Sequence, residues 1–112
     1  MKKTKLGEFE ELVLLAVAAL QADAYGVEIK RELEHRLRTT LSVGSIQSAL
    51  KRMEDKGFLT SSWGEATQKR GGKRKRIYKT TSLAHKVLNE MREIRNGLWQ
   101  EMPKLAAQLK AI

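Results

Sequence analysis

Apolar residues recur at helical spacing in the first third of the chain. Phe9, Leu12, Val13, Ala16 and Leu20 mark one face of a helix predicted over residues 7–20. A second helix is predicted over residues 24–38, with Asp23 as its N-cap and apolar positions four residues apart. The pattern therefore predicts two amphipathic helices that bury facing stripes.

A third helix is predicted over residues 43–56, opened by Ser42 or Leu41 after a break at residues 39–42. Its buried stripe is Ile46, Leu50 and Met53. Gly57 is typical of the glycine that ends a helix in a Schellman turn, with Phe58 as its hydrophobic partner. Helix, short break, amphipathic helix and glycine together outline a helix-turn-helix.

The composition then changes to that of strands. Residues 58–63 and 74–80 predict two strands around a polar loop, residues 64–72, that ends in a glycine pair. This β-hairpin is the wing of a winged helix-turn-helix. Trp63 and Tyr78, on opposing strands, are expected to pack the wing against the helices rather than to stack on bases.

A long final helix is expected after Thr81, which can cap it. Its apolar positions Val87, Met91, Ile94 and Leu98 alternate by four, three and four residues, a seam typical of helix pairing. We therefore expect a homodimer, with a kink or restart near Pro103. Trp99 is expected to pack at the dimer seam; a flat wall for a planar ligand between subunits is the alternative.

The predicted fold class is mainly α with a small antiparallel β-hairpin. Residues 1–80 form a winged helix-turn-helix domain and residues 81–112 a C-terminal dimerisation helix. No internal repeat is visible.

The location of the positive charge narrows the function. The net charge is +9, and residues 66–89 hold eight basic residues and no acidic one. A focal cluster of this kind makes a local positive potential that suits a polyanion. Most of it lies on the wing: Lys69, Arg70, Lys73, Arg74, Lys75 and Arg76. These side chains are expected to contact phosphates or enter the minor groove.

The third helix carries the candidate residues for reading bases. Its expected DNA-facing residues are Ser42, Gly44, Ser45, Gln47, Ser48, Lys51 and Arg52. Gln47 can pair with adenine, the serines are short enough for close approach, and Lys51 and Arg52 can reach phosphate or guanine.

Other function classes find little support. The chain has no cysteine, and His35 and His85 are isolated, so no metal site, cofactor site or catalytic set is expected. The longest apolar stretch, residues 12–20, is too short to span a membrane, and no signal peptide is visible. We expect a soluble, cytoplasmic protein that is not an enzyme.

Four stretches in order, LGEFEELVLLAVA, AYGVEIKREL, SVGSIQSALKRMEDKGFLTSSWGEA and GGKRKRIYKTT, resemble the PadR-like family of winged helix-turn-helix transcriptional regulators. The resemblance covers roughly residues 6–99. It implies that Tyr25 and Gly26 open the second helix, that ALKRMEDKG belongs to the recognition helix, and that Trp63 lies on the first wing strand. It also implies a repressor that dimerises through a single C-terminal helix and releases DNA on binding a small molecule.

Three positions depart from the family pattern. Gln47 replaces the usual tyrosine of the recognition helix, Thr80 a usual leucine and Ala84 a usual glycine. The leading hypothesis is a sequence-specific regulator that binds double-stranded DNA as a homodimer, with a small-molecule effector as a further partner. The alternatives are a ligand-sensing module with its main site at the dimer interface and a non-specific architectural nucleic-acid-binding protein.

Overall fold

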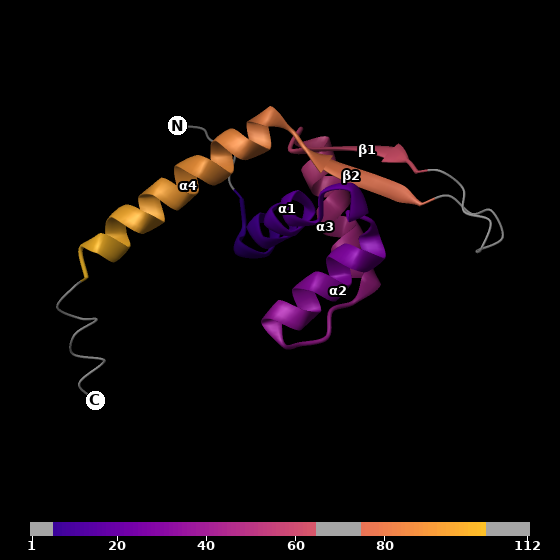
Figure 1. The fold of residues 1–112 in the computed structure, drawn as a ribbon, viewed down its shortest axis with the longest axis horizontal. Helices are drawn as coiled ribbons and strands as arrows, with labels where there is room; N and C mark the ends of the chain where they lie inside the picture. The colour runs from indigo at the N-terminus through magenta and orange to yellow at the C-terminus, as the bar shows by residue number, and fades with distance from the viewer. Residues whose placement is uncertain (1–5, 65–74, 103–112) are drawn as a thin grey trace.

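The computed structural model describes residues 6–64 and 75–102. The elements are α1 (Glu8–Leu20), a 3-10 turn η1 (Gln21–Asp23), α2 (Gly26–Leu37), α3 (Val43–Asp55), β1 (Leu59–Trp63), β2 (Arg76–Thr80) and α4 (Ser82–Gln100). The first three helices pack together, the hairpin extends past them, and α4 leaves as a long arm (Figure 1). This mainly helical winged-helix architecture with one antiparallel hairpin confirms the predicted fold class.

The second helix begins later than its apolar spacing predicts, at the Tyr25–Gly26 pair that the family resemblance implies, and Asp23 is not its N-cap. Asp23 belongs to η1, and the N-cap is Tyr25, whose side chain makes no capping bond. The reason is tertiary: the Tyr78 N–H donates to the Ala24 carbonyl at 3.0 Å, and Tyr25 forms an isolated bridge with Ile77. Residues 24–25 are therefore held extended beside β2, and the helix begins at Gly26.

Both ends of α3 confirm the sequence prediction. Ser42 is its N-cap, with an extended backbone. At the other end Gly57 has a φ of +85°, the left-handed conformation that favours glycine. The Phe58 N–H donates to the Met53 carbonyl at 2.8 Å, and the Gly57 N–H donates to the Glu54 carbonyl at 3.1 Å. These two bonds are the Schellman pair.

The two strands pair in antiparallel register, from Leu59 opposite Thr80 to Trp63 opposite Arg76. The predicted second strand begins at residue 74, which lies outside the described residues. Phe58 and Tyr78 are buried among the helices, so the hairpin closes one side of the core, as predicted for Tyr78. The core also takes Val13, Leu14, Val17, Ile29, Leu33, Ile46, Leu50 and Met53.

Helix α4 starts on this core and then leaves it. The Thr81 hydroxyl accepts from the Ala84 N–H at 3.2 Å and donates to the Gly57 carbonyl at 2.7 Å. Ala84 is fully buried, and Val87 and Leu88 pack against the core. The predicted cap is thus confirmed. The kink expected at Pro103 lies outside the described residues.

Candidate nucleic-acid interface

One face of α3 is open to solvent. All seven residues predicted to face DNA are exposed: Ser42, Gly44, Ser45, Gln47, Ser48, Lys51 and Arg52. The opposite face is buried through Ile46, Ala49, Leu50 and Met53. The first turn contains no acidic residue, so the partial positive charge of the helix N-terminus remains available to an anion.

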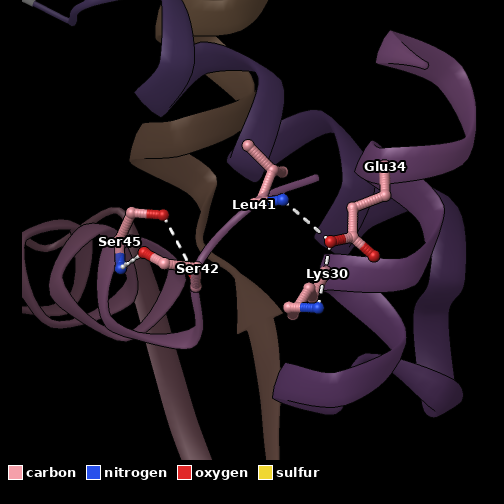
Figure 2. Close-up of polar contacts among 5 residues, drawn as sticks. All are labelled: Lys30, Glu34, Leu41, Ser42 and Ser45. Atoms are coloured by element: carbon pink, nitrogen blue, oxygen red, sulfur yellow. Dashed lines mark hydrogen bonds and ion pairs between the residues drawn. The ribbon is translucent and has the colours of Figure 1, made fainter. Parts of the chain in front are cut away.

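The turn before α3 is fixed by a carboxylate (Figure 2). Oε2 of Glu34 accepts the Leu41 N–H at 2.8 Å and the Lys30 ammonium at 3.0 Å. The Leu41 hydrogen bond, followed by that of Lys30, lowers the pKa of Glu34. Next to this turn, the Ser42 Oγ accepts the Ser45 N–H at 3.0 Å and the Ser45 hydroxyl donates to the Ser42 carbonyl at 3.0 Å. The start of α3 is therefore set both by its own cap and by α2.

Gln47 lies against the first turn of α2. A Cβ at Gly26 would stand 3.0 Å from Nε2 of Gln47, so one of the two would have to shift. A Cβ at Gly44, in contrast, would meet nothing within 4 Å. Packing explains Gly26, whereas Gly44 leaves the outer surface of α3 bare, as close approach of a duplex requires. No pattern in the sequence indicates the contact between Gly26 and Gln47, because the two residues lie on different helices.

The two cations of α3 differ in their surroundings. Lys51 is exposed and lies 3.6 Å from the exposed carboxylate of Asp55, a weak pair in water. Arg52 Nε donates to Oε2 of Glu10, a buried residue of α1, at 2.7 Å. Lys56 lies 3.7 Å from the other oxygen of Glu10. The Arg52 hydrogen bond is the largest cause that lowers the pKa of Glu10. Arg52 thus anchors α3 to α1, and its contact with DNA stays a prediction.

The wing is described only at its base. Lys69, Arg70, Lys73 and Arg74 lie outside the described residues. Lys75 lies with its ammonium 5.3 Å from the centre of the Tyr25 ring. The Arg76 guanidinium lies 4.9 Å from the Trp63 ring. Both are cation–π contacts, so Lys75 and Arg76, the two described members of the predicted basic cluster and here called the wing base, each lie on an aromatic face.

The expectation that Trp63 packs against the helices is wrong. Its side chain is 57% exposed. Trp63 stands at the outer end of β1, opposite Arg76, beyond the point where Tyr78 fills the space above the helices. Tyr78 is buried, and that burial, followed by the nearby charge of Glu54, raises the pKa of its phenol.

The wing base and the polar face of α3 adjoin each other. Gln47, Lys51 and Glu54 recur at helical spacing on one side of α3. The Ser61 hydroxyl of β1 donates to Oε2 of Glu54 at 2.7 Å, and Arg76 Nε donates to that same hydroxyl at 2.9 Å. A continuous chain of hydrogen bonds therefore joins the exposed stripe of α3 to the second wing strand.

The predicted dimerisation stripe on α4 divides into two parts. Val87 packs on the core and Met91 is half-buried, whereas Ile94 and Leu98 are 63% and 64% exposed. Trp99 is 67% exposed. The outer half of α4 thus carries apolar side chains that are uncovered within this single chain.

A hollow of about 800 Å³ lies between α1 and α4. Its lining includes Leu15, Leu88 and Trp99 as apolar walls and Arg92 and Arg95 as cations. At its edge Arg95 donates to Oε2 of Glu11 at 2.5 Å, and the Glu11 side chain is only 8% exposed. The hydrogen bond and charge of Glu11 raise the pKa of Arg95. The sequence placed Trp99 at a seam but gave no sign of this ion pair between α1 and α4.

Two further properties hold for residues 6–64 and 75–102. No helix there has the length and apolar character needed to cross a membrane. No group of three histidine, aspartate or glutamate side chains is arranged there to hold a metal ion.

Known structures share this architecture. A PadR-like transcriptional regulator from Bacillus cereus superposes with a TM-score of 0.70 at 20% identity, over 88% of this chain and 90% of the other. A PadR family transcription regulator from Clostridium difficile is 28% identical with a TM-score of 0.57, over 92% and 98% of the two chains. A PadR family transcriptional regulator from Eggerthella lenta is 25% identical with a TM-score of 0.63, over 88% and 86%.

The sequence comparison gives the same family. No curated protein sequence matches significantly, but the model of the transcriptional regulator PadR-like family matches residues 14–90. That range includes all of α2, α3 and the hairpin, and most of α1. Members of this family are transcription factors rather than enzymes, and they act on DNA. An exposed helix whose first turn holds no acidic residue, beside a cationic hairpin, fits that activity, and the chain belongs to the PadR-like family of transcriptional regulators.

Proposed function

We propose that this PadR-like regulator is a cytoplasmic repressor that binds a specific sequence in double-stranded DNA as a homodimer. The observation that carries the proposal is the adjacency of the exposed face of α3 and the cationic wing base. A helix of this kind fits the major groove, and its first residues reach base edges. Lys and Arg of the wing then hold phosphates and supply affinity that is independent of sequence.

The proposed contacts separate into two classes. Gln47 reads a base, because it lies on the exposed face in the second turn of α3. Arg74 and Arg76 contact the backbone. Further contacts with the duplex are assigned to the rest of the predicted set: Ser42, Gly44, Ser45, Ser48, Lys51, Arg52 and the remaining cations of the wing.

The test begins by selecting bound fragments from random duplex DNA and measuring affinity for the selected operator and for bulk DNA across salt concentrations. Gln47→Ala is expected to cost about 1–3 kcal/mol on the operator and little on bulk DNA. Arg74→Gln with Arg76→Gln is expected to weaken binding to both and to reduce the salt slope by about 2, roughly one per phosphate. Gln100→Ala, an exposed glutamine on α4, is the matched control.

Equal effects of the two changes on both DNAs would contradict the assignment of roles. Failure of the wild-type protein to bind any duplex at low salt would overturn DNA binding. A promoter that carries the selected operator should be transcribed less when the protein is present; increased transcription would assign activation instead.

Dimerisation through residues 81–112 is the second part of the proposal, with residues 1–80 as the DNA-binding domain. It is supported by the exposed Ile94 and Leu98 on the outer half of α4, because an uncovered apolar stripe on a helix favours pairing. Ile94→Glu with Leu98→Glu should give a folded monomer in sedimentation at micromolar concentration. Gln100→Glu adds a charge on the same helix and should remain a dimer. A wild-type monomer under these conditions would refute the interface.

A small-molecule effector is the third part, and the hollow between α1 and α4 supports it. Trp99 gives one wall of that hollow and Arg92 and Arg95 give cations near it. Planar compounds that bind there should quench Trp99 fluorescence, measured in a Trp63→Phe background so that one tryptophan reports. No quenching by a broad panel of planar compounds would contradict this site.

A further inference from the structure

The geometry points to Trp63 and Ser61 as positioning residues that hold the Arg76 guanidinium as a preformed ligand for a DNA phosphate. This inference rests on the proposed DNA-binding function and adds two residues to it. Trp63 is the partner of Arg76 in the hairpin register, and the guanidinium lies 4.9 Å from the indole ring. Ser61 lies two residues earlier on β1, on the same side of the hairpin.

The hydrogen-bond directions around Ser61 are fixed by its neighbours. The Glu54 carboxylate only accepts, so the Ser61 hydroxyl gives it its proton at 2.7 Å. The lone pairs of that hydroxyl then accept the Arg76 Nε–H at 2.9 Å. One edge of the guanidinium is thereby tied to the strand.

The other edge of the Arg76 guanidinium carries its two terminal nitrogens. A guanidinium has five N–H donors, and only the Nε–H is taken by Ser61. Within the described residues, the two terminal nitrogens of Arg76 have no hydrogen-bonded or ion-paired partner. Together they form a fork whose spacing matches two oxygens of a phosphate.

The surroundings of Arg76 differ from those of two arginines that form long-range ion pairs. Arg52 and Arg95 each contact a carboxylate of α1 directly, so their charge is compensated where they lie. Arg76 is separated from Glu54 by a hydroxyl group and is held otherwise by the face of an indole. A cation–π contact fixes a cation without neutralising it, so its charge stays available to the DNA backbone.

The exposure of Trp63 supports the same role. A tryptophan that is 57% exposed at the end of a strand adds little to the core. Its ring instead limits the rotamers of a long side chain, which loses less conformational entropy when phosphate binds. Glu54, which accepts the hydrogen bond of Ser61, lies on the same side of α3 as Gln47 and Lys51. The terminal nitrogens of Arg76 therefore lie beside the predicted major-groove surface.

The test is a double-mutant cycle on the full-length protein, read as affinity for duplex DNA at low salt. Trp63→Ala should weaken binding about two- to fivefold, and Trp63→Phe should weaken it less because a ring remains. Arg76→Ala should weaken binding about fivefold or more and lower the salt slope by about 1. In the Arg76→Ala background, Trp63→Ala and Ser61→Ala should have no further effect, because their target is gone.

Thr60→Ala is the matched control, since Thr60 is exposed on the other side of β1. It should bind DNA as the wild type does. Far-ultraviolet circular dichroism and thermal unfolding of every variant check that the hairpin persists.

Two results would overturn the inference while leaving DNA binding intact: an unchanged affinity in Trp63→Ala, or losses from Trp63→Ala and Arg76→Ala that multiply in the double variant. The second result would mean that Trp63 contacts DNA independently. If the wild-type protein does not bind duplex DNA at all, the proposed function itself fails.

Discussion

Replacing Ser42 separates the structural role of the α3 N-terminus from its proposed role on DNA. The Ser42 Oγ accepts the Ser45 N–H at 3.0 Å (Figure 2), one of the helix donors that have no partner within the helix. Ser42→Ala removes this acceptor and should cost about 1 kcal/mol of unfolding free energy. For a domain of about 100 residues, that corresponds to a fall in Tm of roughly 4–8 °C.

Ser42→Asp keeps an acceptor at the cap and adds a negative charge at the positive end of the helix. Its Tm should equal or exceed that of the wild type. The same charge lies on the face that we assign to DNA, so it should weaken duplex binding at low salt. Ser82→Asp, the same change at the first residue of α4, is the matched control and should leave DNA affinity much closer to that of the wild type.

Thermal unfolding and duplex binding of these variants give the answer. An unchanged Tm in Ser42→Ala would show that the cap adds nothing to stability. Wild-type affinity in Ser42→Asp would refute the placement of the α3 N-terminus against DNA, whatever happens to stability.

Three further outcomes follow from single contacts. Hydrogen bonds from Leu41 and Lys30 lower the pKa of Glu34 in the folded protein. Its carboxylate therefore stabilises the fold at pH values above the ordinary pKa of glutamate, and this stabilisation is lost as the pH falls through the lowered pKa. Urea unfolding should therefore show Glu34→Gln less stable than the wild type at neutral pH, and a gap that does not close in acid would contradict this. Gly57→Ala should cost about 1–2 kcal/mol by thermal unfolding, because the φ of +85° is unfavourable for alanine while its Cβ would only touch Leu83 at 3.8 Å; Gly57→Asn should cost less, and a reversed order would exclude backbone strain. Arg95→Ala should lower the Tm by leaving the nearly buried Glu11 carboxylate unpaired, whereas Arg92→Ala should change it less; equal losses would show that the ion pair has no special role.

Some features of the candidate site were visible in the sequence because they depend on near neighbours. The seven polar residues of α3 follow from the periodicity of a single helix, and all are exposed. Trp63 shows where this reasoning fails. An aromatic side chain on a strand predicts packing against the helices, but the end of β1 extends past them. The Trp63 ring contacts the Arg76 guanidinium instead of a core residue. Glu10 and Glu11 lie in the first turn of α1, and no neighbour in the sequence indicates their partners: Glu10 pairs with Arg52 of α3 and Glu11 with Arg95 of α4.

The sequence by itself determined the helix-turn-helix, the Thr81 cap, the Schellman turn at Gly57 and the region of positive charge, and it narrowed the start of α3 to Leu41 or Ser42. Each of these depends on residues a few positions apart, whose periodicity, backbone preference or charge acts locally. Only the tertiary structure decided where α2 begins, which cations pair with a carboxylate and which remain available to a phosphate. These outcomes depend on contacts between distant segments, such as Ala24 with Tyr78 and Glu10 with Arg52, because a backbone or charged group takes its final partner only after the elements have packed.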